Sequence, residues 1–241
     1  MHLLIVGAGY WGSKLRERFD SLLGSENVWV ADVDSRQVDH LKVQHYTNDY
    51  RLFLDQVDAC VIATPPSTHF EIAKACLEAG KAVLCEKPLA LTSIAAYELA
   101  AAARRVGVPL MVDSTWLYHS AVQKAIELMP NPLEMDITWS NPRVETPPEG
   151  ILWTLGPHPM SLIVRMMGAP GRVTGHVSPR TVTLDFWGMQ APIPAHARLQ
   201  MTWATDEKVR TFVATGSKGA VTSLTQFSDA TMPHDPRSGS R

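Results

Sequence analysis

The chain has 241 residues, of which 45% are hydrophobic and 19% are charged, a composition typical of a globular protein and too apolar for a disordered one. Its 22 Lys and Arg residues against 24 Asp and Glu residues give a net charge of -2, without the basic excess of a nucleic-acid-binding protein. No apolar run approaches the roughly 18 residues of a membrane span, and the N-terminus lacks the basic start of a signal peptide. We therefore expect neither nucleic acid nor a membrane among its partners.

The cysteines and histidines indicate neither a metal site nor a disulfide framework. Cys60, Cys76 and Cys85 stand in apolar segments and match no common zinc spacing. His119 and His176 have no carboxylate or Cys partner at ligand spacing. The sequence therefore predicts a protein of the reduced cytoplasm without a bound metal.

Residues 1–113 alternate short apolar runs with helical patterns, and continuous apolar runs are typical of strands that are covered on both faces. Thr68, followed three residues later by Glu71, resembles a capping box and predicts the start of a helix. The repeated order of strand, helix and strand predicts an α/β fold with a doubly wound parallel sheet. The expected strands span residues 3–6, 28–31, 59–63, 82–85 and 109–112, and the expected helices span residues 11–23, 35–43, 68–79 and 92–106.

The composition changes near residue 113, because 13 of the 17 prolines and five of the seven tryptophans lie beyond it. Segments rich in β-branched and aromatic residues follow one another there with turn residues between them, which predicts a smaller α+β domain with an open, mostly antiparallel sheet. We expect domains at 1–113 and 114–232 and a disordered tail at 233–241. The expected strands span 133–139, 181–187, 195–203, 208–214 and 220–224, and one helix is expected at 157–167.

A glycine loop follows the first expected strand. Gly7, Gly9 and Gly12 fit the pattern G-x-G-x-x-G, and Asp32 lies 20 residues beyond Gly12 at the end of the second strand. This combination is the dinucleotide-binding fingerprint. A carboxylate at Asp32 accepts hydrogen bonds from the ribose hydroxyls and repels a 2′-phosphate, which favours NAD over NADP. Arg36 could instead cover the adenine or contact a phosphate, so NADP remains an alternative.

Further candidates for the cofactor site lie in and beyond this loop. Tyr10 and Trp11 stand inside the glycine loop, where they either contact the cofactor or pack in the core. Thr64 and Pro65 follow the strand at 59–63, and a loop at the carboxyl end of a parallel strand faces the ligand crevice. His69 either contacts the cofactor or, on spacing alone the simpler interpretation, marks the start of a helix.

Glu86, Lys87 and Pro88 follow the strand at 82–85. A Lys at a strand end beside a nicotinamide is a candidate proton carrier, because burial and a nearby positive ring both lower the pKa of a Lys. The alternative is a surface Lys, which is the usual position of this residue type. The spacing leaves both interpretations open.

Four motifs in this order resemble the glucose–fructose oxidoreductase, inositol dehydrogenase and MocA (Gfo/Idh/MocA) family over residues 1–120: the glycine loop, residues 63–69, residues 79–81, and residues 86–88. The resemblance implies a Rossmann domain followed by an α/β domain with an open sheet. It also implies that Lys87 lies at the nicotinamide and that Glu86 and Pro88 hold it there. Residues 112–119, which include Tyr118, resemble the crossover of a subgroup that acts on sugars and sugar nucleotides.

Residues 153–158 resemble the second catalytic motif of the family, in which an Asp and a His stand four residues apart. His158 matches the His, whereas Thr154 occupies the Asp position and cannot accept a proton at neutral pH. Because side chains at i and i+4 share a helix face, both positions can reach one substrate carbon. The resemblance implies that His158 is catalytic and that Tyr118, Trp153, Thr154 and His158 line the substrate site. Residues 216–219 resemble a late turn of the family's sheet, beyond which most relatives continue further, so we expect the second domain to be short for the family.

These residues together predict an NAD(P)-dependent oxidoreductase. A hydride passes between the nicotinamide and a hydroxyl or ketone carbon of a sugar, sugar nucleotide or similar small polar metabolite, while Lys87, helped by His158, moves the proton. Two alternatives are an imine (C=N) reductase of the same family and a non-catalytic NAD-binding sensor or partner subunit, which Thr154 favours. We also expect a homo-oligomer, because no helix predicted after residue 170 covers the Trp-rich sheet of the second domain.

Overall fold

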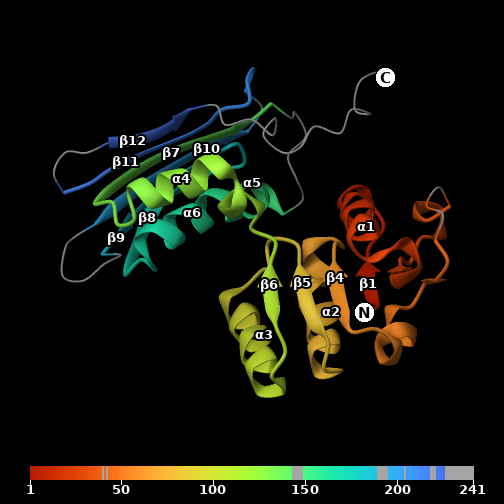
Figure 1. Cartoon of the computed structure of the whole chain (residues 1–241). Helices are drawn as coiled ribbons and strands as arrows, with labels where there is room; N and C mark the ends of the chain where they lie inside the picture. Colours follow the sequence, from red (N-terminus) through yellow and green to blue (C-terminus); the bar gives the residue numbers. More distant parts are fainter. Residues whose placement is uncertain are drawn as a thin grey trace. The chain divides into compact units, whose positions relative to one another are not determined.

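The computed structural model in Figure 1 describes residues 1–39, 41, 43–142, 149–188, 195–203, 205–217 and 221–225. The chain divides into two compact units, Met1–Asp113 and Ser114–Arg241. The expected tail at 233–241 lies outside the described residues. None of the helices in the described ranges is both long enough and apolar enough to cross a membrane.

The first unit is built on a six-stranded sheet in which all neighbouring strands run parallel, in the order β3-β2-β1-β4-β5-β6. The order reverses between β1 and β4, which is the arrangement of a Rossmann fold and places a crevice at the carboxyl ends of these strands. The predicted parallel sheet is therefore confirmed. The strands are β1 (Leu3–Val6), β2 (Val28–Ala31), β3 (Tyr46–Thr47), β4 (Ala59–Ile62), β5 (Ala82–Cys85) and β6 (Leu110–Val112).

Helices cover both faces of this sheet, which explains why its strands are apolar throughout. Helix α1 (Tyr10–Leu23) packs against one face, where Leu3 and Ile5 of β1 lie in the core. Helices α2 (Pro66–Glu78) and α3 (Ser93–Val106) pack against the other face, where Leu4 and Val6 of β1 lie. Neighbouring residues of one strand thus enter two different cores.

Two local predictions for this unit are wrong. The segment expected as a helix at 35–43 forms only a short 3₁₀ turn at Ser35–Gln37, because the Asp34 side chain accepts the Arg36 N–H and closes a tight turn there. Helix α2 does not begin at Thr68 with a capping box. It begins at Pro66, and the Thr68 hydroxyl donates instead to Thr64 Oγ1 (2.7 Å) and to the carbonyl of Pro65 (2.8 Å).

The second unit contains a six-stranded sheet in the order β12-β11-β7-β10-β9-β8. Its central strands β7 and β10 pair parallel, and the four other described pairs are antiparallel, which confirms a mostly antiparallel sheet. The strands are β7 (Glu134–Asn141), β8 (Arg172–Val177), β9 (Thr181–Trp187), β10 (His196–Trp203), β11 (Arg210–Thr215) and β12 (Val221–Thr225), and the helices are α4 (Ser120–Leu128), α5 (Gly150–Leu155) and α6 (Pro157–Met167).

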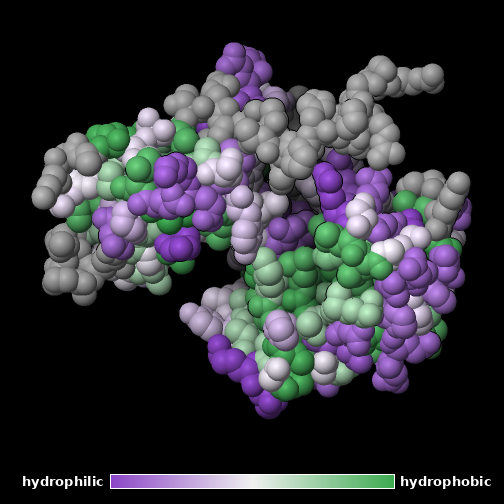
Figure 2. Space-filling view, in the orientation of Figure 1, coloured by the Kyte–Doolittle hydropathy of each residue, from purple (hydrophilic) through white to green (hydrophobic). Residues whose placement is uncertain are grey.

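The three helices of this unit lie on one face of its sheet (Figure 1). Trp139 and Phe212 of the sheet and Leu162 of α6 are fully buried in the core between these layers. The outward side of α4 is hydrophilic in Figure 2, in keeping with its exposed Gln123 and Lys124. The helices therefore cover the apolar face of the sheet.

The helices contradict the reason for which we expected a homo-oligomer. We predicted an uncovered, apolar and Trp-rich face, but the unpredicted helices α4 and α5 join α6 in covering it. The open face carries mainly polar side chains, because successive residues of a strand point to opposite faces. Its central strands expose Asp136, Thr138, Arg198 and Gln200 there.

Candidate dinucleotide-binding and catalytic site

The glycine loop connects β1 to the N-terminus of α1. A Cβ at Gly12 would lie 1.8 Å from the carbonyl oxygen of Gly7, and Gly7 has a φ of +95° with the carbonyl oxygen of Ala63 2.7 Å from its own Cβ position. The two glycines therefore let α1 and the loop after β4 approach the turn closely. A Cβ at Gly9 would meet nothing within 4 Å, so the loop leaves space on that side.

This helix terminus suits a phosphate. The first turn of α1 contains no acidic residue, and no side chain of the described structure caps it. The free N–H groups at a helix N-terminus attract anions, and the open space beside Gly9 lets a pyrophosphate come close to them. Tyr10 and Trp11 begin this helix, and both side chains are exposed. The pair lies edge to face, with 5.1 Å between the ring centroids.

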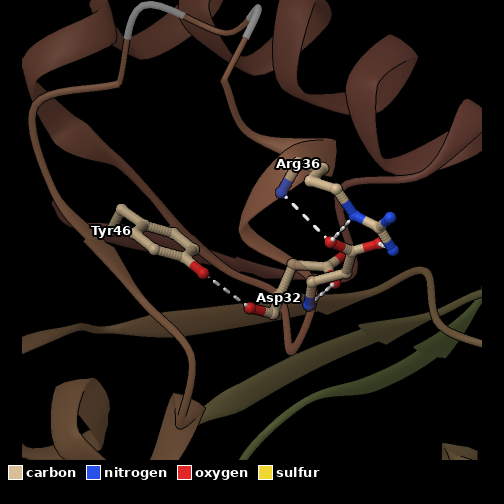
Figure 3. A network of polar contacts seen from close by, with 4 residues as sticks. Asp32, Arg36 and Tyr46 are labelled. Atoms are coloured by element: carbon tan, nitrogen blue, oxygen red, sulfur yellow. Dashed lines mark hydrogen bonds and ion pairs between the residues drawn. The ribbon is translucent and has the colours of Figure 1, made fainter.

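Asp32 follows β2 and its carboxylate is held beside the glycine loop. The N–H of Ala8 donates to Oδ2 at 2.6 Å, and the N–H of Asp34 donates to Oδ1 at 2.9 Å. Figure 3 shows Tyr46 on the other side of this turn, where its hydroxyl donates to the Asp32 carbonyl at 3.0 Å. Each carboxylate oxygen has a second lone pair, so the group can still accept hydroxyl donors from a ribose.

Arg36 turns toward Asp34. Its Nε lies 2.8 Å from Oδ1 and its Nη2 lies 2.8 Å from Oδ2, which is a bidentate ion pair on an exposed surface. The hydrogen bond from Arg36 holds the pKa of Asp34 below its usual value. The guanidinium predicted as a cofactor contact therefore already has a carboxylate partner in the protein (Figure 3).

The loop after β4 lies against the glycine loop through the close approach of Ala63 to Gly7. Thr64 and Pro65 follow, and Pro65 is the residue before α2. His69 lies within α2, and only 1% of it is exposed. Its two ring nitrogens face carbonyl oxygens of the protein, so the ring points into the unit rather than toward solvent.

Glu86 and Lys87 follow β5 at the same edge of the sheet. The Glu86 N–H donates to the Ile62 carbonyl of β4 at 2.8 Å, and the Lys87 N–H donates to Glu86 Oε2 at 3.2 Å. Burial first, and then the negative charge of Asp113 after the neighbouring β6, raise the pKa of Glu86 to about 7. Lys87 is half-buried, which differs from the fully exposed position of an ordinary surface Lys.

The carboxyl ends of β1, β2, β4 and β5 thus bring the predicted residues of the first unit to one edge of the sheet. Asp113 was not among the predicted site residues, although the order of the strands could have indicated it. Its N–H donates to the Cys85 carbonyl at 2.8 Å, so it follows β6 where Glu86 follows β5. In the parts of the chain that the structure describes, no group of three His, Cys, Asp or Glu side chains is arranged to hold a metal ion.

The other candidates lie in the second unit. Thr154 is on α5, and its hydroxyl donates to the Gly150 carbonyl at 3.0 Å. His158 is on α6, which starts at Pro157, and Gly156 separates α6 from α5. Trp153 is 36% exposed and Tyr118 is 65% exposed, so both side chains are accessible in part.

Two aromatic residues and an arginine near His158 were not predicted. The His158 ring is stacked on Trp139 with 6.2 Å between centroids and is edge to face with Trp116 at 6.4 Å. The guanidinium of Arg210 lies over the same two rings, 4.5 Å from the Trp116 centroid and 5.3 Å from that of Trp139. Arg210 pairs with Trp139 across β11 and β7, and this register cannot be obtained from sequence spacing.

The fold and the glycine loop together define a dinucleotide-binding α/β protein with a second α+β unit. A comparison with known families agrees with this class, because residues 1–114 match the Gfo/Idh/MocA family, described as "Oxidoreductase family, NAD-binding Rossmann fold". The NAD-binding unit of the chain is therefore similar to that of the Gfo/Idh/MocA oxidoreductases, which confirms the resemblance of its motifs.

Individual relatives are similar over parts of the chain. The inositol 2-dehydrogenase 2 of Saccharopolyspora erythraea is 35% identical over 118 residues, which are 46% of this chain and 35% of that protein. The D-apiose dehydrogenase of Paraburkholderia graminis is 30% identical over 125 residues, 49% of this chain and 33% of that protein. The chain thus spans about a third of the length of these curated relatives.

A solved structure extends the similarity to both units. The crystal structure of a putative oxidoreductase from Magnetospirillum magnetotacticum has a TM-score of 0.79 and 28% sequence identity. The match covers 93% of this chain and 77% of that one. The two-unit α/β architecture is therefore shared with that putative oxidoreductase.

Proposed function

We propose that the protein is an NAD-dependent oxidoreductase acting on a hydroxyl or ketone carbon of a sugar, sugar nucleotide or similar small polar metabolite. The observation that carries this proposal is that the glycine loop, Asp32 and Lys87 occupy one edge of a single parallel sheet. An edge of this kind is where α/β proteins bind dinucleotides. The sugar-type substrate is supported by the similarity to inositol and D-apiose dehydrogenases.

The choice of NAD over NADP follows from the charges around Asp32. Its carboxylate is fixed by two backbone N–H groups, so a 2′-phosphate would meet a negative charge that cannot easily turn away. Arg36, which could neutralise such a phosphate, would have to leave its bidentate pair with Asp34. Both features favour NAD, whose adenosine ribose has two free hydroxyls, over NADP.

Lys87 is the proposed proton carrier. Bound NAD supplies the acceptor or donor of the hydride. The Lys87 ammonium would then give a proton to the substrate oxygen when a carbonyl is reduced, and the neutral Lys87 amine would take the proton when a hydroxyl is oxidised.

His158 is proposed as a second proton-transferring group, and Thr154 as an adapted pocket residue. The Thr154 hydroxyl donates to the Gly150 carbonyl within the helix, and a Thr hydroxyl cannot accept a proton at neutral pH. This departure favours an imine reductase as the second candidate function, because an imine nitrogen is more basic than a carbonyl oxygen and depends less on a carboxylate. A sensor or partner subunit without catalysis is the third possibility.

A panel of substrates separates these functions. NADH with carbonyl and imine compounds, and NAD with the matching alcohols, should give a change in absorbance for at least one polyol or sugar pair. Turnover of imines alone would identify the second candidate. Tight NADH binding without turnover of any compound would contradict the enzyme and leave the sensor.

We also propose self-association through the open face of the second sheet. The Trp187 ring lies on this face, 44% exposed, and stacks on His196 with 4.0 Å between centroids. Asp185 accepts a hydrogen bond from His196 and one from Arg198, both at 2.9 Å, which orders the side chains of this face. Light scattering at micromolar concentration should give a multiple of 26.6 kDa, whereas a monomeric mass would contradict the proposal.

The cysteines support a location in the reduced cytoplasm. Cys60, Cys76 and Cys85 are all buried as free thiols in the first unit. Burial raises the pKa of Cys85 to about 12, so this thiol remains protonated beside the candidate site. We therefore propose no role for it in the chemistry.

A further inference from the structure

His69 connects two loops that the site uses. Its ring Nδ1 lies 2.7 Å from the carbonyl oxygen of Pro88, and its Nε2 lies 2.8 Å from the carbonyl oxygen of Thr64. Thr64 belongs to the loop after β4, and Pro88 directly follows Lys87 in the loop after β5. One buried ring on α2 thus connects the loop after β4 to the loop after β5.

The chemistry of its two partners restricts the ring. A backbone carbonyl oxygen only accepts hydrogen bonds, whereas a neutral imidazole has one N–H donor and one nitrogen lone pair. In the neutral form, one nitrogen lone pair would therefore face a carbonyl oxygen at hydrogen-bond distance with no proton between them. Such an unsatisfied contact is costly in a site where His69 is 1% exposed.

Both contacts become hydrogen bonds only if the ring carries a proton on each nitrogen. Both observed distances lie within the range of N–H···O hydrogen bonds. We propose that His69 is a doubly donating, cationic clamp that holds the Thr64 loop and the Lys87–Pro88 loop at a fixed separation. It is a positioning residue for Lys87, and only this last role rests on the proposed function.

The clamp gives the position of Lys87 a specific origin. The backbone of Lys87 is fixed on one side by its N–H bond to Glu86 Oε2 and on the other by the His69 bond to Pro88. A glutamine at position 69 could donate only from one amide nitrogen, so it would hold one loop and release the other. Displacements of a catalytic group by about 1 Å cost on the order of a hundredfold in rate.

Nitrogen NMR of the histidine rings tests the clamp in the intact chain without cofactor. The signals of His69 are assigned by their loss in His69→Gln, with His176→Gln, on the exposed strand β8, as the matched control. We expect both ring nitrogens of His69 to resonate in the protonated range at neutral pH, each with an N–H proton that exchanges slowly. One unprotonated ring nitrogen would overturn the clamp, and this result needs no substrate or turnover.

Steady-state kinetics test the positioning role. With a substrate from the panel, His69→Gln should lower kcat by about tenfold or more and weaken NADH binding less, whereas His176→Gln should change neither. An unchanged kcat in a folded His69→Gln protein would overturn the positioning role. If no substrate is found, the proposed function fails, but the NMR result still decides whether the clamp exists.

Discussion

Replacement of Asp32 separates the charge of its carboxylate from its role in the loop. Asp32→Asn keeps one side-chain oxygen as an acceptor but removes the negative charge, and Asp32→Ala removes both. In the protein, Oδ2 accepts the Ala8 N–H at 2.6 Å and Oδ1 accepts the Asp34 N–H at 2.9 Å. Asp32→Ala leaves both N–H groups without this partner, and Ala8 is 1% exposed, so part of the effect will be a loss of stability.

The magnitude follows from these bonds. Charge-assisted hydrogen bonds to ribose hydroxyls are worth about 1.5–3 kcal/mol, and removal of the repulsion toward a 2′-phosphate acts in the opposite direction on NADP. We expect both variants to narrow the preference for NADH over NADPH by about 1–3 kcal/mol, with Asp32→Asn retaining more of the wild-type stability.

Tryptophan fluorescence is a suitable assay for this prediction. Trp11 is 55% exposed at the start of α1, next to the expected pyrophosphate position, so its emission should report binding. Titrations with NADH and NADPH give the two dissociation constants for each variant. Tighter binding of NADPH by the wild type would refute the reasoning and would mean that Arg36, rather than Asp32, controls the site.

Three further changes test other parts of the account. Gly12→Ala should destabilise the protein by about 3 kcal/mol or more in urea unfolding, because its Cβ would meet the Gly7 carbonyl. Gly9→Ala should leave stability nearly unchanged and weaken NADH binding. Equal stability of the two variants would contradict this prediction. Burial and Asp113 raise the pKa of Glu86 from 4.5 to about 7, so the contribution of this group to the free energy of unfolding falls as the pH rises through that interval. Glu86→Gln should therefore be more stable than the wild type above pH 7 by on the order of 2 kcal/mol. An identical pH dependence of stability in the two proteins would disprove this prediction. Thr154→Asp should leave activity equal or lower, because a new carboxylate must lose its hydration there, and a gain of more than about tenfold would show that Thr154 is instead a damaged catalytic position.

The first unit was largely predictable because its strands carry a local signal. The runs at 3–6, 28–31 and 82–85 match β1, β2 and β5 in their bounds, since strands buried on both faces are apolar at every position. The helix predicted at 35–43 was wrong because the Asp34 carboxylate competes for the backbone N–H of Arg36 and forms a turn.

The second unit was less predictable because its helices are short or irregularly spaced. The signal for α4 was present, with Val122, Ala125 and Ile126 buried at helical spacing, but no helix was predicted there. Its strand β8 is almost entirely exposed and therefore lacks an apolar pattern. The contacts of Arg210 depend on the register of β11 against β7, which only the three-dimensional structure supplies.

The candidate site was also predictable only in part. The glycine loop and Asp32 were predictable because their spacing expresses backbone geometry that a dinucleotide requires. The pairing of Arg36 with Asp34 and the two carbonyl partners of His69 were not, because each depends on side-chain directions. Asp113 lies 27 positions beyond Glu86, and only the adjacency of β5 and β6 makes the two carboxylates neighbours.

The turnover of Lys87→Met is the most direct measurement of the central claim. Lys74→Met is the matched control, because this lysine pairs with Glu98 on the surface of the same unit. We predict that Lys87→Met loses about 10²–10⁴-fold in kcat while NADH affinity stays within about tenfold of the wild type, and that Lys74→Met changes neither. Full activity of Lys87→Met would contradict Lys87 as the proton carrier and, with it, the proposed mechanism.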